Sequence, residues 1–455
     1  MSYTNAYISP SPGKFPIIAW GGFSIEREKE IRNNFGTDSK EFKDFLKKEI
    51  DHIKGMGFSV ATRPLYDSYR FVRPSLVNSG LSIIGSTPNS EKQLESIENF
   101  TLYLDRFLSL NNIDEIVSWL IVDEPNYKQL SLCRDIKNVL IDRIYSRKPM
   151  NFWINCLCDV PKDATNTVNP DDSEMPGYLM TYPEYLGKVQ EIFTPQVWSF
   201  DQYPLRIKRG EIVVQDSYFE TLRYYMLMSK RTGRPFWAFC QCLTILCAKN
   251  GNTHGIATPV PSYQYMRFEA FSSLAYGAQG IEYWSLIARK DTTEVGEIKP
   301  RFGAAPLDDN GNIFDATIYN AIKELNSEIE KGSHIFLKAV PEKVRHTGKA
   351  VWNDVEYYEP GESFGPLHNL VSTNKGVIIS WLKNGSDNYL LIMNHDPSAS
   401  QIITLYIDSR TTIWRISLTK EPEMSVLHEG DITSAPQSVF YKRTLEAGGY
   451  LLLKW

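Results

Sequence analysis

The sequence predicts an α/β fold, a (β/α)8 (TIM) barrel, followed by a C-terminal all-β sandwich. Strand-like and helix-like segments alternate eight times between residue 15 and about residue 335, and eight such units close a parallel barrel. No glycine-rich phosphate-binding motif follows the first strand, which argues against an open doubly wound sheet. Short alternating runs replace this pattern after about residue 337. We therefore place the barrel at residues 1–336 and the sandwich at residues 337–455.

The expected barrel strands are short, apolar segments rich in β-branched and aromatic residues. They are Phe15–Phe23, Phe58–Leu65, Leu81–Thr87, Val117–Asp123, Met150–Leu157, Val197–Tyr203, Phe236–Cys242 and Gly280–Leu286. Between them, apolar residues recur at helical spacing. The clearest predicted helices are residues 39–54, 90–109 (with Ser90 as its N-cap), 263–279 and 315–331.

The expected sandwich strands alternate apolar and polar residues and are separated by turn residues. They are Val377–Trp381, Tyr389–Asn394, Ile402–Ile407, Thr412–Leu418 and Tyr450–Trp455. The turn Lys383-Asn384-Gly385-Ser386-Asp387 predicts an antiparallel connection between the first two.

Composition narrows the classes of partner. The chain has 455 residues, a 42% hydrophobic share and a net charge of −5 without a basic block, so we expect no nucleic-acid partner. No apolar run approaches the ~20 residues of a membrane span. The N-terminus has neither a charged nor an apolar leader region. The protein is thus expected to be cytoplasmic, or secreted or periplasmic if a signal peptide has been removed.

The fourth predicted strand carries the most informative motif. An apolar run ends in Asp123 and Glu124, and Pro125 prevents the strand from continuing. In a (β/α)8 barrel the carboxyl ends of the strands form the active-site face. The other predicted strand ends add an amide-, acid- and aromatic-rich set: Trp20, Arg63, Tyr66, Asn155, Asp201, Tyr203, Trp237, Gln241, Glu282, Tyr283 and Trp284.

These residue types point to carbohydrate chemistry. Cleavage of a glycosidic bond uses one acid to protonate the leaving oxygen and a second carboxylate that delivers water or stabilises the cationic centre. Aromatic rings bind the apolar face of a sugar, while amides and arginine bind its hydroxyls. None of the seven histidines ends a predicted strand, no G-x-S-x-G motif is present, and no lysine ends a barrel strand. We therefore expect no metal and no cofactor.

The strand ends resemble those of the large clan of retaining (β/α)8 glycoside hydrolases. In that clan an acid/base Glu follows an Asn at the end of strand four; Glu124 matches the Glu, and Asp123 occupies the Asn position. Tyr203 and Trp284 match aromatic residues that line the clan's sugar site. Residues 276–284 (YGAQGIEYW) and 389–396 (YLLIMNHD) are similar to segments of such barrels and of the sandwich that often follows them.

One departure from the clan affects the mechanism. The clan's nucleophile is a Glu at the end of strand seven, where this chain has Gln241, and an amide cannot form a covalent glycosyl-enzyme. Two carboxylates can substitute for it. One is Asp201. The other is Asp123, because an adjacent Asp-Glu pair resembles hexosaminidases, in which the Asp orients the substrate's own 2-acetamido group as nucleophile.

Structural roles compete with these assignments. Asn126 can cap a following helix whose dipole favours Asp123 and Glu124, and Asp201 can bond to backbone amides before Pro204. A second set has equally ordinary alternatives: Gln241 as a satisfied polar group in the barrel, Trp20, Trp237 and Trp284 as core residues, Arg63 in an ion pair with Asp67 or a rim acid, and Glu282 facing the helices.

Together these observations predict a glycoside hydrolase of oligo- or polysaccharides. Its mechanism is retaining by substrate assistance, or uses a non-standard second carboxylate. Glu124 is the general acid/base, and Asp123 or Asp201 is its partner. The carboxyls of Glu124 and Asp201 are expected either about 5 to 5.5 Å apart, as in retaining sites, or about 6.5 to 9.5 Å apart, as in inverting sites. The sugar-binding set is Trp20, Arg63, Asn155, Tyr203, Trp237, Gln241, Glu282 and Trp284. The alternatives are a non-catalytic glycan-binding protein on a degenerate barrel and, third, a lyase or transglycosylase.

Overall fold

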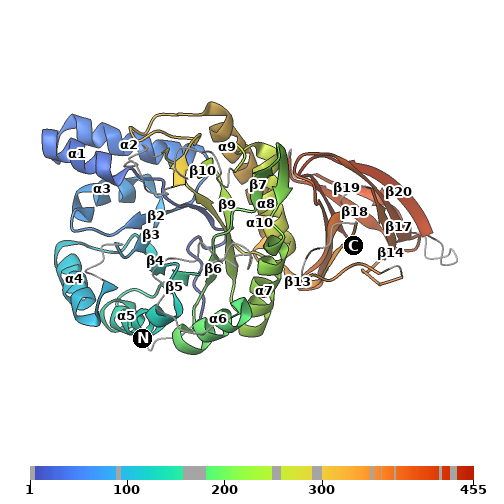
Figure 1. The fold of residues 1–455 in the computed structure, drawn as a ribbon, viewed down its shortest axis with the longest axis horizontal. Helices are drawn as coiled ribbons and strands as arrows, with labels where there is room; N and C mark the ends of the chain where they lie inside the picture. Colours follow the sequence, from blue (N-terminus) through green and yellow to red (C-terminus); the bar gives the residue numbers. More distant parts are fainter. Residues whose placement is uncertain are drawn as a thin grey trace.

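A computed structural model gives the arrangement of most of the chain. It describes residues 6–88, 94–156, 181–247, 258–288, 300–348, 352, 354–359, 361–373, 376–419, 423–430 and 438–455. In these residues a ring of strands and helices lies beside a smaller all-β part (Figure 1), which confirms the predicted fold class.

The barrel is a closed parallel sheet with one strand in each predicted position. Its strands are β1 (Ile17–Ala19), β2 (Val60–Pro64), β3 (Ser82–Ser86), β4 (Ile116–Asp123), β5 (Asn151–Asn155), β6 (Trp198–Phe200), β9 (Phe236–Gln241) and β11 (Ile281–Trp284). Their order is β5-β4-β3-β2-β1-β11-β9-β6. A parallel bridge between Cys156 and Phe200 joins β5 to β6 and closes the ring. All the carboxyl ends therefore meet at one rim.

Helices cover the outside of the ring (Figure 1). They are α1 (Ile25–Phe35), α2 (Lys40–Gly55), α3 (Tyr69–Ser79), α4 (Ile97–Leu110), α5 (Leu130–Leu140), α6 (Tyr182–Lys188), α7 (Ser217–Thr232), α8 (Tyr263–Ala275), α9 (Ala316–Lys331) and α10 (Ser333–Phe336). Single turns η2 (Tyr127–Gln129), η3 (Ile141–Tyr145) and η6 (Val189–Phe193) adjoin α5 and α6. Two small antiparallel sheets lie near the rim: the hairpin of β7 (Leu205–Lys208) with β8 (Glu211–Val214), and the pair of β10 (Ile245–Cys247) with β12 (Pro300–Phe302).

Helix α4 begins later than its apolar spacing predicts. Its N-cap is Ser96, whose side chain accepts a hydrogen bond from the backbone N–H of Asn99 at 3.2 Å. The predicted cap, Ser90, lies outside the described residues. Ser96 has the geometry of a side-chain cap because it is extended and is followed three residues later by an unbonded N–H.

Inside the barrel, alternate residues of the strands fill the lumen. The lower layer is Ile18, Val60, Ile84, Leu120, Trp153, Val197 and Trp237, with Tyr7 and Trp20 packed against it. Trp153 and Trp237 meet edge to face with ring centroids 5.1 Å apart. This apolar layer forms the floor on which the polar residues of the upper layer stand.

The sandwich consists of two antiparallel sheets. The larger has the order β13-β15-β16-β21-β18-β19 and the smaller β14-β17-β20. Their strands are β13 (Val340–His346), β14 (Leu367–Ser372), β15 (Val377–Asn384), β16 (Asp387–Asn394), β17 (Gln401–Asp408), β18 (Ile413–Ser417), β19 (Glu423–His428), β20 (Ser438–Leu445) and β21 (Tyr450–Lys454). The change from helices to strands falls between Phe336 and Val340, while the domain boundary at residue 336 stays a prediction.

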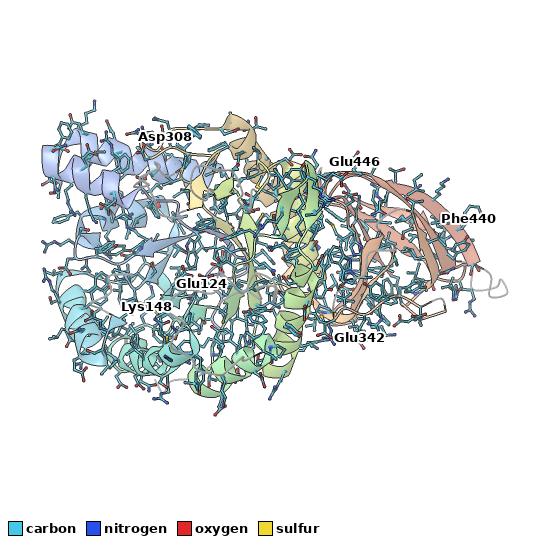
Figure 2. The ribbon with its side chains drawn as sticks, viewed as in Figure 1. Glu124, Lys148, Asp308, Glu342, Phe440 and Glu446 are labelled. Carbon is cyan, nitrogen blue, oxygen red and sulfur yellow. The ribbon has the colours of Figure 1, made fainter. Side chains whose placement is uncertain are left out.

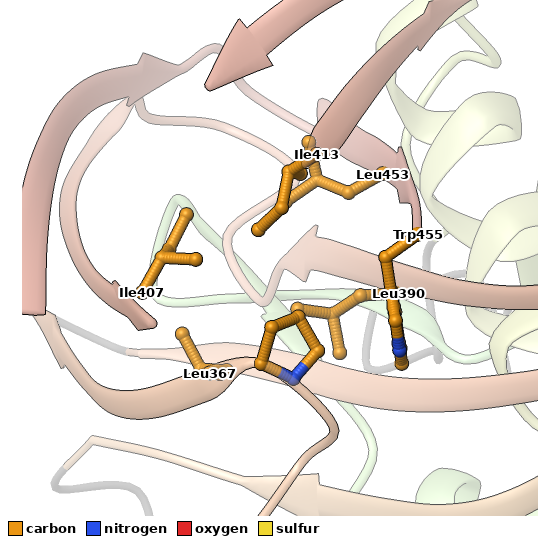
Figure 3. A pocket seen from close by; sticks show the side chains of 7 residues that line it. Leu367, Leu390, Ile407, Ile413, Leu453 and Trp455 are labelled. Atoms are coloured by element: carbon orange, nitrogen blue, oxygen red, sulfur yellow. The ribbon is translucent and has the colours of Figure 1, made fainter. Parts of the chain in front are cut away.

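The two faces of the larger sheet have different partners. Alternate residues such as Ile379 and Ile392 face the smaller sheet, whereas Ile378 and Leu391 join the apolar core of the barrel helices. Figure 3 shows a small cavity between the sheets, lined by apolar side chains that include Leu367 and Trp455. Its volume of about 10 Å³ and its lack of polar lining suit neither a ligand nor a bound water.

Helix α8 forms a central part of the contact between barrel and sandwich. The ring of Phe271 stacks on that of Tyr450 with centroids 3.9 Å apart. Ser380 Oγ of β15 donates to the carbonyl of Ala275 at 2.6 Å, and Arg267 Nε donates to the carbonyl of Gly448 at 3.0 Å. Because buried polar groups pay for desolvation unless they are bonded, these contacts fix one relative position of the two parts.

We expect Ser380→Ala to lower the free energy of unfolding by about 1–3 kcal/mol, because it leaves the buried Ala275 carbonyl without its donor. Urea denaturation followed by tryptophan fluorescence measures the change. Ser417→Ala is the matched control. Ser417 lies in the same sheet, but the hydrogen bond of its hydroxyl is exposed to solvent, so this substitution should change stability by less than about 0.5 kcal/mol. An equal effect of the two substitutions would contradict the stability contribution that we assign to the hydrogen bond between Ser380 and Ala275.

Candidate active site

The end of β4 departs from regular strand geometry in two ways. The pairing with β5 shifts register between Leu120 and Asp123, and this bulge turns Asp123 toward the lumen, where Val122 would otherwise point. Glu124 then has a φ of 49°, a left-handed conformation that costs a non-glycine residue about 1–2 kcal/mol. Such outliers concentrate at functional sites. Figure 2 labels Glu124 among the barrel strands, far from Phe440 in the sandwich.

Asn155 at the end of β5 connects the acids. Its Nδ2 donates to Asp123 Oδ1 at 2.9 Å and to Asp201 Oδ1 at 3.0 Å. Its backbone carbonyl accepts the N–H of Glu124 at 2.8 Å. The side chain is only 1% exposed, so these bonds form away from competing water. One buried residue thus bonds the carboxylates of Asp123 and Asp201 and the backbone of Glu124.

Asp201, just beyond β6, forms a hydrogen-bonded acid pair with Glu124. Desolvation, the charge of Glu124 and the hydrogen bond to Glu124 raise the pKa of Asp201 well above its usual value, while Asn155 and Tyr203 lower it in part. Desolvation followed by the charge of Asp123 raises the pKa of Glu124, while the hydrogen bond with Asp201 lowers it in part. The Glu124 side chain is exposed, so solvent limits that shift. Two acids in hydrogen-bond contact share a proton.

The direct bond between Glu124 and Asp201 differs from the separation expected from the sequence. The expected separations are about 5 to 5.5 Å or about 6.5 to 9.5 Å, but a hydrogen bond joins the two carboxyls. The left-handed turn at Glu124 is the physical reason, since it redirects the side chain across the rim toward β6. The two acids therefore form one hydrogen-bonded pair.

The Asp123 carboxyl, partly buried at the end of β4, has a raised pKa. Burial and the charge of Asp201 raise its pKa to about 6, against the lowering by Asn155. At pH 7 Asp123 is therefore mostly ionised, whereas the pKa of Asp201 beside it lies well above its usual value. The site thus places carboxyls with differently shifted pKa values side by side.

Aromatic rings border the acids. Tyr203 stacks on Trp284 with centroids 5.1 Å apart and an interplanar angle of 24°, and Tyr203 also hydrogen-bonds Asp201. Trp20, half-buried, packs edge to face on Phe239 at 5.0 Å. These rings offer flat apolar surface beside the carboxylates, which suits a sugar ring.

Ser199 and Glu282 lie beneath the acids and are fully buried. Ser199 Oγ lies 2.8 Å from Asn155 Oδ1 and 2.8 Å from Glu282 Oε1. Glu282 faces the lumen, because it pairs in register with the inward-facing Ile18. The alternative in which it faces the helices is therefore wrong; Tyr283 faces them instead, against Phe58.

Three predicted sugar-binding residues lie elsewhere. Arg63 is 2% exposed and forms an ion pair with Glu28 of α1, while Asp67 pairs with Arg106. Trp237 is in the apolar floor. The Gln241 amide donates internally, to the Leu243 carbonyl at 2.7 Å and to Thr258 Oγ1 at 2.5 Å. The structure brings none of the three into contact with the acids.

Sequence reasoning missed Ser199. The signal was available, since Ser199 is two residues before Asp201 and alternate residues of a strand share a face. Asn126 does cap η2, accepting from Gln129 N at 3.1 Å, so the capping role and the catalytic candidates coexist in one motif.

The described residues include neither a metal site nor a membrane-spanning helix. Within them, no group of three or more His, Cys, Asp or Glu side chains has the arrangement of a metal site. None of the helices among them combines the length and apolarity that a bilayer span requires.

Replacing Asn155 with leucine should destabilise the protein more at pH 8 than at pH 5. The pKa values of Asp123 and Asp201 are higher in the folded protein than in the unfolded chain. The folded protein therefore loses stability as the pH rises from the unfolded toward the folded pKa values. Removing the amide donor raises the pKa values of both aspartates further. We therefore expect Asn155→Leu to lower the free energy of unfolding by about 1–3 kcal/mol more at pH 8 than at pH 5. Unfolding in urea at both pH values measures it. Asn326→Leu, which removes a buried amide bonded to the Met56 carbonyl, should give a pH-independent loss; the same behaviour in Asn155→Leu would contradict the assignment.

Comparison with known proteins supports the fold. No protein-family model and no curated protein matches the chain. A catalytic mutant of a GH42 β-galactosidase from G. stearothermophilus is similar in structure, with a TM-score of 0.55, 9% identity and coverage of 99% of this chain and 100% of that chain. A β-galactosidase from Bacillus circulans sp. alkalophilus gives a TM-score of 0.53, 10% identity and coverage of 97% and 99%. These structural neighbours are glycoside hydrolases, and at this identity the likeness concerns the fold.

Proposed function

We propose that the protein is a glycoside hydrolase acting on a glycosidic bond of an oligo- or polysaccharide. The observation that carries the proposal is the group of three carboxyls, Asp123, Glu124 and Asp201, at the carboxyl ends of the barrel strands with raised pKa values. Burying like charges together is unfavourable, so a purely structural role gives no reason to collect them. Protonation of a leaving oxygen beside a carboxylate requires such a group.

The roles follow from where the protons reside. Glu124 is the exposed member of the proton-sharing pair and is the general acid/base that meets the glycosidic oxygen. Asp201 stores the proton behind it, held by Asn155 and Tyr203. Asp123, with a pKa of about 6, is the ionised second carboxylate at neutral pH. It either stabilises the cationic sugar directly or orients a 2-acetamido group that acts as nucleophile.

The sugar-binding surface is the aromatic border of the acids. Tyr203 and Trp284 form one wall, and Trp20 lies at the mouth of the lumen. Asn155 serves the carboxylates instead of the sugar, because Asp123, Asp201 and Ser199 engage its side chain.

A glycan-binding protein without catalysis is the second candidate. The observation that favours it is the internal bonding of the Gln241 amide at the position where the clan has its nucleophile. The two functions differ in turnover, which the following experiments measure.

We expect Glu124→Gln to reduce kcat/KM about 10²- to 10⁴-fold on glycosides with a poor, alkyl leaving group, because a neutral amide cannot protonate the departing oxygen. The loss should be much smaller on nitrophenyl glycosides, whose leaving group departs as the anion. Glu98→Gln, the same change at an exposed position of α4, is the control and should behave as wild type. Equal losses on both substrate types would remove Glu124 from the acid role.

A panel of aryl glycosides with and without a 2-acetamido group should show turnover that depends on Asp123. We expect Asp123→Asn to lower kcat more than Asp201→Asn on nitrophenyl substrates, because these need the anion and not the proton. Turnover of 2-acetamido sugars alone would assign substrate assistance, and turnover of the others would assign direct participation of Asp123. Binding by calorimetry without any turnover of the panel would favour the glycan-binding protein.

A further inference from the structure

We propose that Glu282 is a positioning residue for the site: as a neutral acid it donates to Ser199, which donates to Asn155 and thereby fixes the amide between Asp123 and Asp201. The inference deepens the proposed function and rests on it for the roles of the two aspartates. It moves Glu282 from the sugar-binding set to a buried chain below the reacting groups.

Counting hydrogens on Ser199 gives the first reason. The hydroxyl lies 2.8 Å from two acceptor-type oxygens, Asn155 Oδ1 and Glu282 Oε1, yet it has one hydrogen to donate. Asn155 Oδ1 carries no hydrogen, so Ser199 must donate there. Its contact with Glu282 is then a hydrogen bond only if Glu282 carries a proton.

The surroundings of Glu282 give the second reason. Its side chain is fully buried, and its Oε2 has no hydrogen-bond partner among the described residues. The strands on either side place the apolar Ile18 and Phe239 level with it. The charged groups that act on it are Asp123 and Asp201, both acidic. Burial and these charges raise the pKa of Glu282 well above its usual value, against the lowering by Ser199. An isolated buried carboxylate would be costly, whereas the neutral acid is not.

The geometry of Asn155 gives the consequence. An amide can rotate by half a turn and exchange its oxygen and nitrogen. With Oδ1 held by Ser199, Nδ2 must face Asp123 and Asp201. Without that donor, the rotated amide would present its oxygen to two acids, and the pKa of Asp123 would lose the contribution of Asn155 that lowers it.

Four variants separate positioning from mere packing. Glu282→Gln keeps a neutral donor, so we expect kcat and the pH profile of wild type. Glu282→Leu and Ser199→Ala break the chain, and we expect kcat to fall about 10- to 100-fold with KM within about twofold. The acidic limb of the pH–rate profile should move to higher pH, because the pKa of Asp123 is then higher and Asp123 ionises at a higher pH. Thr62→Val removes another buried hydroxyl, that of Thr62 in β2, and should leave the limb in place.

A measurement without substrate tests the protonation itself. A folded pKa above the unfolded value makes wild type lose stability as pH rises from about 4.3 toward the folded value. Glu282→Gln removes that titration, so its stability relative to wild type should increase between pH 5 and pH 8 in urea unfolding. This stability measurement tests the protonation of Glu282 even if the protein hydrolyses no glycoside. A stability difference that does not change with pH, or a wild-type kcat and acidic limb in Glu282→Leu and Ser199→Ala, would overturn the proposal.

Discussion

The site depends on how Asn155 distributes its hydrogen-bonding capacity. Its nitrogen spans two aspartates, its side-chain oxygen accepts from Ser199, and its main-chain carbonyl holds Glu124 in an otherwise unfavourable backbone conformation. Like-charged acids repel when they are buried together, so an arrangement of three needs a donor between them. A short, rigid amide at the end of a buried strand provides it with little loss of side-chain freedom. The barrel contributes the precision, because β5 places Asn155 between β4 and β6, where the acids originate.

The surrounding layers place the acids in different environments. Below them, Trp153 and Trp237 close the lumen with apolar surface, which withholds water from Ser199 and Glu282. Beside them, Tyr203 bonds Asp201 and stacks on Trp284. Glu124 alone extends into solvent. A gradient from a dry floor to a wet rim therefore runs through the group, and the ease of ionisation changes along it.

The barrel could be predicted from the sequence, because each strand is a compact apolar run and eight such strands close a parallel barrel. The strand periodicity also placed Asp123, Glu124, Asn155 and Asp201 at the rim, since a strand end is visible as an apolar run that stops. The direction of each side chain was less accessible. The bulge before Asp123 and the left-handed Glu124 depend on the pairing with β5, which the residues of β4 alone do not encode. Arg63 pairs with Glu28 because α1, an additional helix, folds over β2; its polar, highly charged sequence shows little apolar spacing.

The contact of α8 with the sandwich affects how the chain can be divided. Every residue from Met266 to Ala275 is buried, since strands of the barrel cover one side of the helix and β15 and β16 cover the other. A barrel expressed alone would expose the side of this helix that the sandwich covers, including the ring of Phe271, and newly exposed apolar surface promotes aggregation. The sandwich thus acts as the outer wall of the barrel, and gene fusions or domain exchanges that retain one part should carry the other with it.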